Sequence, residues 1–448
     1  MKHHLILTLI LATASSLAAQ SPMVKQLTEQ LAQQGSRLAE METLRMTYDN
    51  PQQHPASAHE LRVRLDGGIQ VVTECHTEND VYTQKDYFLN ESKVYALRVS
   101  QQAPCLDGKT KRVAESLILF DKGTPLLRTT RSTRVPVADT NPKLSKVSEH
   151  EMPLPAGLDG WGDKLTALAF DIARRFRTGV GKHVFGNWDE SLLKDAPPAG
   201  SSEKPLRNAD WLPPPDVLAL PIPLSESPDG LFAIGWGYAE GPVDWPKLAA
   251  DGAHPDFGEI YFTTKLVEGA LDPPLSDDSN FLLNAQNGKQ LGNLGAYHPG
   301  ERQRFNHDEL LVTWSPSSTC FIVRETAKWE TAAAGIGWIK DGRCDGTFEI
   351  LAPLETAAIA AVLKSKDPAA KRLRSKDEGE GFAFSVYNLL LEDDGRIEAR
   401  VVGQIPKDDR PGGIYEAIVE GVLSPGTGES DAVLKTSKVK VIPQKPQE

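Results

Sequence analysis

The chain has 448 residues, of which 40% are hydrophobic and 25% are charged, and its formal net charge is −12. This length accommodates two or three domains with cores of their own, and the ordinary composition excludes a chain that is disordered throughout. The charges of both signs are interspersed, and an acidic balance argues against nucleic acid or anionic lipid as a partner, because phosphate contacts require clustered Lys and Arg.

The first 19 residues are typical of a signal peptide. Lys2 makes a positive start, residues 5–12 are apolar, and the small residues that follow suit cleavage after Ala18 or Ala19. An uncleaved anchor is the alternative. No later stretch approaches the ~18 apolar residues of a spanning helix. We therefore expect a periplasmic or secreted protein without a membrane span.

Four cysteines follow the signal segment, and none belongs to a Cys-x-x-Cys pair, so a zinc or redox motif is not indicated. An even number of cysteines in an exported chain suggests disulfides. The cysteines fall into two local pairs, which predicts the disulfides Cys75–Cys105 and Cys320–Cys344. Free, buried thiols are the alternative.

Residues 20–50 predict an N-terminal helix, extending over about 22–46. The apolar residues recur at heptad-like spacing and form one stripe. They are Val24, Leu27, Leu31, Leu38 and Met41. Three heptads are short for a coiled coil, so docking of this helix onto the next domain is favoured.

Residues 51–194 predict an antiparallel β meander covered by helices. Leu61, Val63 and Leu65 alternate with charged residues, and an Asp-Gly-Gly turn follows at 66–68. Further strand–turn–strand patterns occur at 87–94 and 118–125. One face of such a sheet requires a cover, which the N-terminal helix and a second helix supply.

The second helix is predicted from apolar residues spaced from Leu165 to Phe176, with Asp163 able to cap its start and Gly179 its end. Three arginines crowd its last turn, at 174, 175 and 177. Cations favour a helix C-terminus, so a dipole-matched helix end is preferred over a patch for an anionic partner.

Residues 195–228 contain nine prolines in 34 positions, which predicts a linker. A second β domain is predicted over 229–448, with an exposed charged connection at 364–380. Two similar turns mark this domain, Ser-Pro-Asp-Gly at 227–230 and Ser-Pro-Ser-Ser at 315–318, which follows Trp314.

These turns, each before a short apolar strand, resemble the blade turns of WD-type propellers, and the hairpin at 281–291 resembles the outer pair of a blade. The resemblance implies a partial or distorted propeller-like domain, because about 240 residues supply no more than five or six blades. The layout also resembles exported bacterial proteins with degenerate propeller-like hairpins, from which no activity is carried over. The predicted fold class is mostly β with a few helices (α+β).

Two aromatic residues in loop-like segments, Trp245 and Trp329, are weak candidates for binding. Six of the eight tryptophans lie between 211 and 338. Aromatic faces stack on sugars, so a Trp-lined groove would suit a glycan, although packing of tryptophan in a β core is the simpler explanation.

Two further patterns contain residue types that can carry chemistry. Ser191 and Lys194 match the Ser-x-x-Lys nucleophile pattern, but the companion motifs of penicillin-binding enzymes are absent. His298 and His307 lie near carboxylates, but their spacing fits no metal-ligand pattern. A polar loop is the better interpretation of that segment, so no metal site, cofactor or catalytic residue is predicted.

The sequence therefore favours an exported, non-catalytic binding or interaction protein of the cell envelope, with an envelope protein or glycan as its partner. A periplasmic hydrolase with a dispersed active site is the alternative, and a purely structural envelope component is a third possibility.

Overall fold

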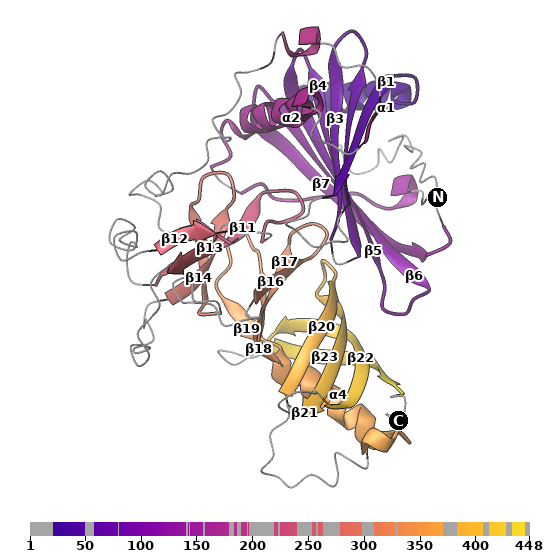
Figure 1. The fold of residues 1–448 in the computed structure, drawn as a ribbon, viewed down its shortest axis with the longest axis vertical. Helices are drawn as coiled ribbons and strands as arrows, with labels where there is room; N and C mark the ends of the chain where they lie inside the picture. Colours follow the sequence, from indigo (N-terminus) through magenta and orange to yellow (C-terminus); the bar gives the residue numbers. More distant parts are fainter. Residues whose placement is uncertain are drawn as a thin grey trace. The chain divides into compact units, whose positions relative to one another are not determined.

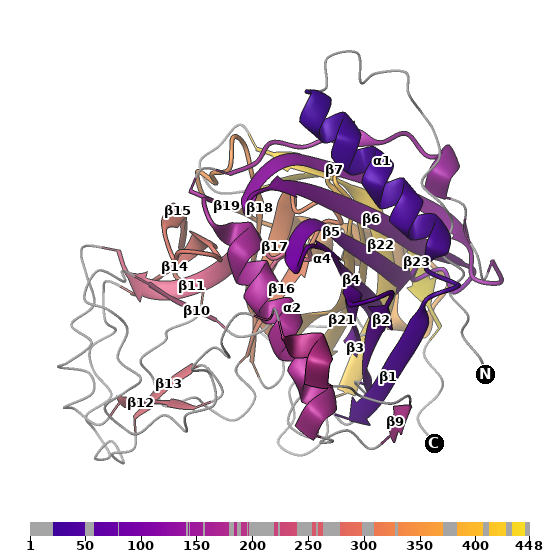
Figure 2. The same ribbon diagram turned by 90° about the horizontal axis from the view of Figure 1, so that it is seen from above.

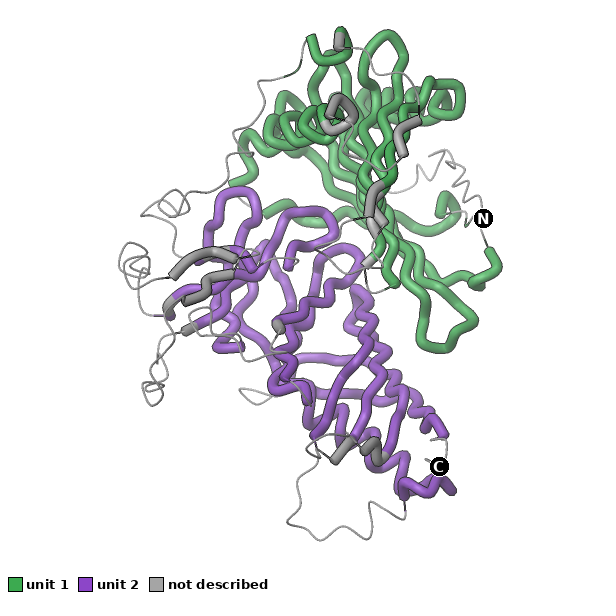
Figure 3. The backbone as a smooth tube through the Cα atoms, viewed as in Figure 1, with its two compact units in different colours: residues 1–204 green, residues 205–448 purple. Residues whose placement is uncertain are grey.

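The computed structural model describes most of the chain. The described residues are 21–49, 58–78, 80–139, 142, 144–155, 157–178, 183–185, 190–194, 196, 219–222, 225–239, 253–256, 259–262, 278–297, 309–327, 330–370, 383–405, 412–426 and 432–443. The chain divides into two compact units, residues 1–204 and 205–448 (Figure 3). The predicted signal peptide lies outside the described residues. No described helix is long and apolar enough to cross a bilayer.

The N-terminal unit is built on one nine-stranded antiparallel sheet (Figure 1). Its strands are β1 (Glu42–Asp49), β2 (Ala58–Leu65), β3 (Ile69–Glu78), β4 (Val81–Asn90), β5 (Lys93–Pro104), β6 (Thr110–Asp121), β7 (Thr124–Pro136), β8 (His150–Glu151) and β9 (His183–Phe185). The first eight strands pair with their sequence neighbours, and β9 returns to pair with β1. The predicted meander is therefore present.

Helix α1 (Pro22–Arg37) covers one face of this sheet (Figure 2). Its stripe is buried against apolar residues of β3 to β7, among them Val71, Phe88 and Leu119. A polar residue interrupts the stripe: the Gln34 amide donates to the Gln70 carbonyl over 3.1 Å and accepts from the Tyr95 hydroxyl over 2.5 Å. These bonds satisfy the amide and fix how the helix lies on the sheet.

The predicted helix is too long, because β1 begins at Glu42. Leu44 and Met46 are almost fully buried, and they alternate with exposed residues, as a strand requires. Leu44 lies three residues after Met41 and so continues the helical spacing, but Met46 lies two residues after Leu44, a spacing that fits a strand.

Helix α2 (Trp161–Thr178) packs on the opposite face of the sheet. The Trp161 and Phe120 rings meet edge to face with centroids 5.1 Å apart. Backbone approaches closely here: a Cβ on Gly162 would lie 2.8 Å from the Gly123 Cα, so only glycine fits. The second predicted helix is therefore present and covers the face that α1 leaves free.

The C-terminal unit contains three four-stranded antiparallel sheets and a small hairpin (Figure 1). The sheets are β10 (Ala219–Pro221), β11 (Phe232–Tyr238), β14 (Asp278–Asn284) and β15 (Gln290–Gly295); β16 (Glu309–Trp314), β17 (Cys320–Thr326), β18 (Thr331–Trp338) and β19 (Thr347–Glu349); and β20 (Ala383–Leu391), β21 (Arg396–Ile405), β22 (Gly412–Pro425) and β23 (Ala432–Ile442). The hairpin joins β12 (Ala253–Asp256) to β13 (Glu259–Phe262). No closed barrel or propeller is detected among the described strands.

Helix α4 (Leu351–Lys364) covers the last sheet and also contacts β18. Its buried residues, with those of the second and third sheets, form one apolar core. Ala369 and Ala370, which follow the helix, are buried in the same core. The predicted exposed connection at 364–380 therefore includes core residues, because two small alanines fit into the packing that their charged neighbours avoid.

The boundary between the units, at 204/205, lies inside the predicted linker of 195–228. The linker ends earlier than predicted, because β10 pairs with β11 and the Ser225 hydroxyl donates to the Ile234 carbonyl over 2.9 Å. β10 has only three residues at the edge of its sheet, where a proline is tolerated.

The same turn recurs in all three sheets, at 227–230, 315–318 and 392–395. In each turn the first carbonyl accepts a hydrogen bond from the fourth N–H, over 2.8, 3.0 and 3.0 Å. The fourth residue has a positive φ of 72°, 54° and 79°. Glycine suits this conformation in the first and third turns, whereas Ser318 adopts it in the second. The second copy therefore keeps the turn without its glycine.

The middle turn also contacts each of the other two turns. The Ser318 hydroxyl donates to Asp229 Oδ1 over 3.1 Å, and the Ser317 N–H donates to Asp393 Oδ1 over 3.0 Å. An aspartate from each outer turn therefore accepts from the middle turn. The Trp314 indole N–H adds a bond of 3.0 Å to the Ser225 carbonyl.

We predict that Ser315→Ala weakens the C-terminal unit by about 1–3 kcal/mol, because the buried Ser315 hydroxyl accepts from the N–H groups of Thr319 and Cys320, each over 3.1 Å. Denaturant unfolding of the full chain measures the change. Ser437→Ala, at an exposed serine of the same unit, is the control and should stay within about 0.5 kcal/mol. Equal losses in the two variants would contradict the role assigned to Ser315.

Candidate functional site

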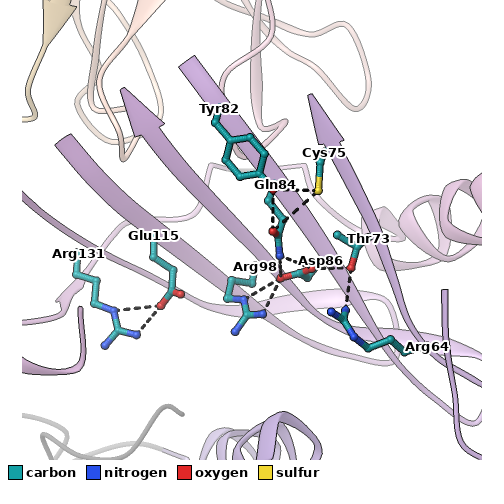
Figure 4. A network of polar contacts seen from close by, with 9 residues as sticks. All are labelled: Arg64, Thr73, Cys75, Tyr82, Gln84, Asp86, Arg98, Glu115 and Arg131. Carbon is teal, nitrogen blue, oxygen red and sulfur yellow. Dashed lines mark hydrogen bonds and ion pairs between the residues drawn. The ribbon is translucent and has the colours of Figure 1, made fainter. Parts of the chain in front are cut away.

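A layer of charged and polar side chains lies on the sheet face that α1 partly covers (Figure 4). Alternate residues of a strand share a face, and the strand register places the members side by side. We call this layer the charged face, and its members are Glu60, Arg62, Arg64, Thr73, Cys75, Tyr82, Gln84, Asp86, Arg98, Glu115 and Arg131. The same face thus has an apolar half beneath α1 and a charged half beside it.

Asp86 is the centre of the charged face, and its side chain is fully buried. Arg98 donates to Asp86 Oδ2 through Nε over 3.1 Å and Nη2 over 2.6 Å, and Thr73 donates to Oδ1 over 2.7 Å. The Gln84 amide lies 3.0 Å from both oxygens. Burial alone would raise the pKa of Asp86, but Arg98, the hydrogen bonds and Arg64 together hold it below its usual value.

Glu60 and Glu115 neutralise other arginines of this face. Glu60 lies between Arg62, at 2.5 Å, and the half-exposed Arg45, at 2.7 Å. Burial opposes the charge of Glu60, but its two arginines outweigh burial and lower its pKa. Glu115 pairs with Arg131 over 2.5 Å. Three ion pairs with little solvent exposure therefore lie within one face.

Arg64 differs from these arginines because no carboxylate of the described residues is in direct contact with it. It is 8% exposed, and its Nη1 donates to the Thr73 hydroxyl over 3.3 Å. Burial lowers the pKa of Arg64, Asp86 raises it, and the neighbouring Arg62 and Arg98 lower it further.

Cys75 belongs to this face, but its thiol has little reactivity. The Tyr82 hydroxyl lies 3.2 Å from its sulfur, and the Gln84 carbonyl oxygen lies 3.9 Å from it. Burial raises the pKa of the Cys75 thiol to about 11. A thiol is a nucleophile as the thiolate, so Cys75 has little reactivity near neutral pH.

The four residues predicted for binding, Trp245, Trp329, His298 and His307, all lie outside the described residues. Ser191 is exposed on η2 (Glu190–Leu193), a single 3-10 turn rather than a helix of a catalytic domain. The described residues also contain no group of three His, Cys, Asp or Glu side chains placed to hold a metal ion.

The sequence did carry a signal for the charged face. Ionic and amide residues lie on this face of β2 and of β4 to β7, and from β4 to β7 their signs oppose one another between neighbouring strands. The positions are 60, 62 and 64 on β2, 84 and 86 on β4, 98 on β5, 115 on β6 and 131 on β7. The apolar alternation at Leu61 and Val63 predicts the strand, but it assigns no role to the charged residues between them.

Neither predicted disulfide is formed, since all four cysteines are free and buried. Cys75 pairs with Gln84, which pairs with Ser100 two strands away, and Cys105 lies five residues beyond Ser100. Strand spacing and rise put the two cysteines roughly 15–20 Å apart. A disulfide requires Cα atoms within about 7 Å.

Cys320 and Cys344 lie on opposite sides of one sheet. Cys320 packs with Ile322 in the core shared with the last sheet. A Cβ on Gly337 would approach both the Phe321 ring and the Cys344 sulfur, at 2.5 and 3.0 Å, so Cys344 lies on the Phe321 side. The prediction of this disulfide from nearness in sequence is therefore wrong. Cys320 and Phe321 are neighbours on one strand and face opposite sides of the sheet, and Cys344 lies on the Phe321 side.

Comparisons with known proteins add no relative: no protein-family model, curated protein or solved structure matches the chain.

We predict that Asp86→Asn weakens the N-terminal unit by about 3–5 kcal/mol, because it leaves the buried Arg98 without its counter-charge. Denaturant unfolding at neutral pH checks this. Asp66→Asn is the matched control in the same unit: Asp66 pairs with Arg37 with both side chains about half exposed, so its loss should cost no more than about 1 kcal/mol.

Acid should lower the stability of the wild-type protein and of Asp86→Asn to different extents. The folded pKa of Asp86 is lowered, so its contribution is complete above the ordinary value of about 4 and is lost as the pH falls through the folded pKa. The wild-type unit should therefore keep this contribution from pH 7 to about 5 and lose it below about 4. Asp86→Asn should show a shallower loss in acid; an identical acid profile would contradict the assignment.

The four cysteines should be unreactive toward thiol reagents in the folded protein. All are buried, and burial raises the pKa to about 11 for Cys75, about 12 for Cys320 and about 11 for Cys344. Unfolding without reductant should then expose four reactive thiols. A count of two or none would show that disulfides form in the isolated protein.

Proposed function

We propose that this chain is an exported, non-catalytic binding protein of the cell envelope, and that its ligand contacts the charged face of the N-terminal sheet. The observation that carries the proposal is Arg64, a buried arginine that has no carboxylate partner among the described residues, within a face whose other buried charges are paired. Buried charges usually have partners, so an unmatched one indicates a place for a ligand.

The chemistry of this face supports binding rather than catalysis. The lowered pKa of Asp86 and its five hydrogen bonds make it a poor proton acceptor, because both oxygens are already occupied. The raised pKa of Cys75 makes it a poor nucleophile. The groups of the face are therefore arranged to hold charge in place rather than to transfer a proton or attack a bond.

Export rests on the signal segment at 1–19, with the periplasm or the exterior as the destination. Both locations would give access to envelope glycans and envelope proteins. We commit to a glycan as the partner, since cell-wall glycans carry carboxylates that match an arginine-rich face.

The C-terminal unit, in this proposal, is a partial propeller-like domain that serves as a platform. Three sheets of four strands follow one another in sequence, and each carries the equivalent turn. The direct contacts among the three turns make them resemble successive blades.

The proposal is tested with soluble, carboxylate-bearing cell-wall fragments and the full chain. Isothermal titration should show saturable binding, and mass spectrometry should recover the fragments unchanged. Cleaved fragments would favour the alternative of a periplasmic hydrolase, which a serine-hydrolase probe on wild type and Ser191→Ala would then examine. Absence of saturable binding would contradict the glycan-binding proposal.

A further inference from the structure

Arg64 lies where the charged and apolar halves of the sheet face meet. Its register partner on β3 is Val71, a residue of the core beneath α1, and its register partner on β1 is the exposed Thr43. The guanidinium carries five N–H donors, and among the described residues one of its nitrogens has a hydrogen-bond acceptor, the Thr73 hydroxyl. The remaining donors of Arg64 are therefore available to another acceptor.

The nearest buried carboxylate has no room to supply that acceptor. Asp86 Oδ2 accepts from both nitrogens of Arg98, and Oδ1 accepts from Thr73. The Gln84 amide occupies both oxygens as well. Asp86 influences Arg64 through space and through the Thr73 hydroxyl, but it does not form an ion pair with it.

We propose that Arg64 is the anchor for an anionic group, a carboxylate or a phosphate, of the ligand that the charged face binds. The guanidinium fork matches either oxyanion with two parallel hydrogen bonds. Thr43 is exposed beside Arg64, so the anion approaches from the β1 side of the face. The proposal rests on the assignment of the charged face as a binding surface and adds the chemical group that it recognises.

Energetics favour an anion at this position over the empty state. A buried cation without a counter-charge is destabilising, and Arg62 and Arg98 add like charge close by. Burial also lowers the pKa of Arg64, as expected for a charge that lacks compensation. An incoming oxyanion would remove this penalty, and the partly desolvated setting would strengthen the new hydrogen bonds.

The experiment follows the arginine side-chain NMR signals of the full chain, labelled with ¹⁵N-arginine. Inorganic phosphate and acetate are titrated separately at constant ionic strength. The Arg64 Nε–H signal, assigned by its loss in Arg64→Lys, should shift saturably. The signal of Arg98, whose carboxylate partner is already in place, should shift little. Saturation by one anion supports the proposal and names the oxyanion, and saturation by both supports an anchor that accepts either oxyanion. No saturable shift of the Arg64 signal overturns the proposal.

Variants give a second readout through thermal unfolding of the N-terminal unit. The anion that saturates Arg64, at a concentration ten times its dissociation constant, should raise the midpoint of wild-type thermal unfolding by roughly 3 °C. Arg64→Gln should lose this rise, and Arg64→Lys should keep part of it. Arg45→Gln is the control, since Arg45 is half exposed and bound to Glu60. An equal loss in Arg45→Gln and Arg64→Gln would overturn the proposal, because it would show a diffuse charge effect.

The two proposals fail separately. Cell-wall fragments that bind without moving the Arg64 signal would leave the proposed function intact and overturn the anchor. Small anions that move the Arg64 signal, together with fragments that do not bind, would leave the anchor intact and overturn the glycan ligand. If folded Arg64→Gln, checked by circular dichroism, binds the fragments at least tenfold more weakly than Arg45→Gln, both proposals are supported.

Discussion

The burial of Asp86 is the constraint on which the N-terminal unit depends. A buried carboxylate is tolerated when its charge is matched and its oxygens are hydrogen-bonded, and Arg98, Thr73 and Gln84 meet both requirements. These partners come from three adjacent strands, so the network requires the register of β3, β4 and β5 to be correct. A slip of one residue would turn every one of these side chains to the other face. The charged layer therefore helps to specify the register of the sheet.

This layer also explains why α1 covers only part of the face. The helix presents an apolar stripe, which fits over Val71, Phe88 and Leu119 but not over the charges next to them. A buried ion pair is weak support for stability, because apolar residues of similar volume often serve as well or better. Several buried ion pairs, and an arginine without a carboxylate partner among the described residues, are what the proposed ligand-binding role of this face would require.

Much of the fold could be predicted from local patterns, and the failures have physical reasons. The stripe from Val24 to Leu31 predicted α1, and the Ser-Pro turns predicted two of the three equivalent hairpins. Leu44 continues the helical spacing from Met41, so the predicted helix is too long, although the two-residue step from Leu44 to Met46 is that of a strand. The third turn was missed as a copy because its sequence is Glu-Asp-Asp-Gly, and only the backbone reveals the equivalence. The candidate site was missed altogether, since a charge between two apolar residues looks solvated until neighbouring strands are aligned beside it.

A second buried arginine shows why lack of a carboxylate is not enough to define a site. Arg324 on β17 is 5% exposed, and burial lowers its pKa to about 10. Its Nη1 donates to the Val386 and Tyr387 carbonyls, where a β-bulge interrupts the pairing of β20 with β21. Arg324 thus satisfies carbonyls that the bulge removes from the ladder, which is a structural task. Among the residues that the structure describes, Arg64 bonds to no backbone carbonyl, and its one hydrogen bond, to the Thr73 hydroxyl, is long at 3.3 Å. The same residue type thus satisfies carbonyls at a bulge in one unit, and in the other it keeps N–H donors for which the described residues offer no acceptor.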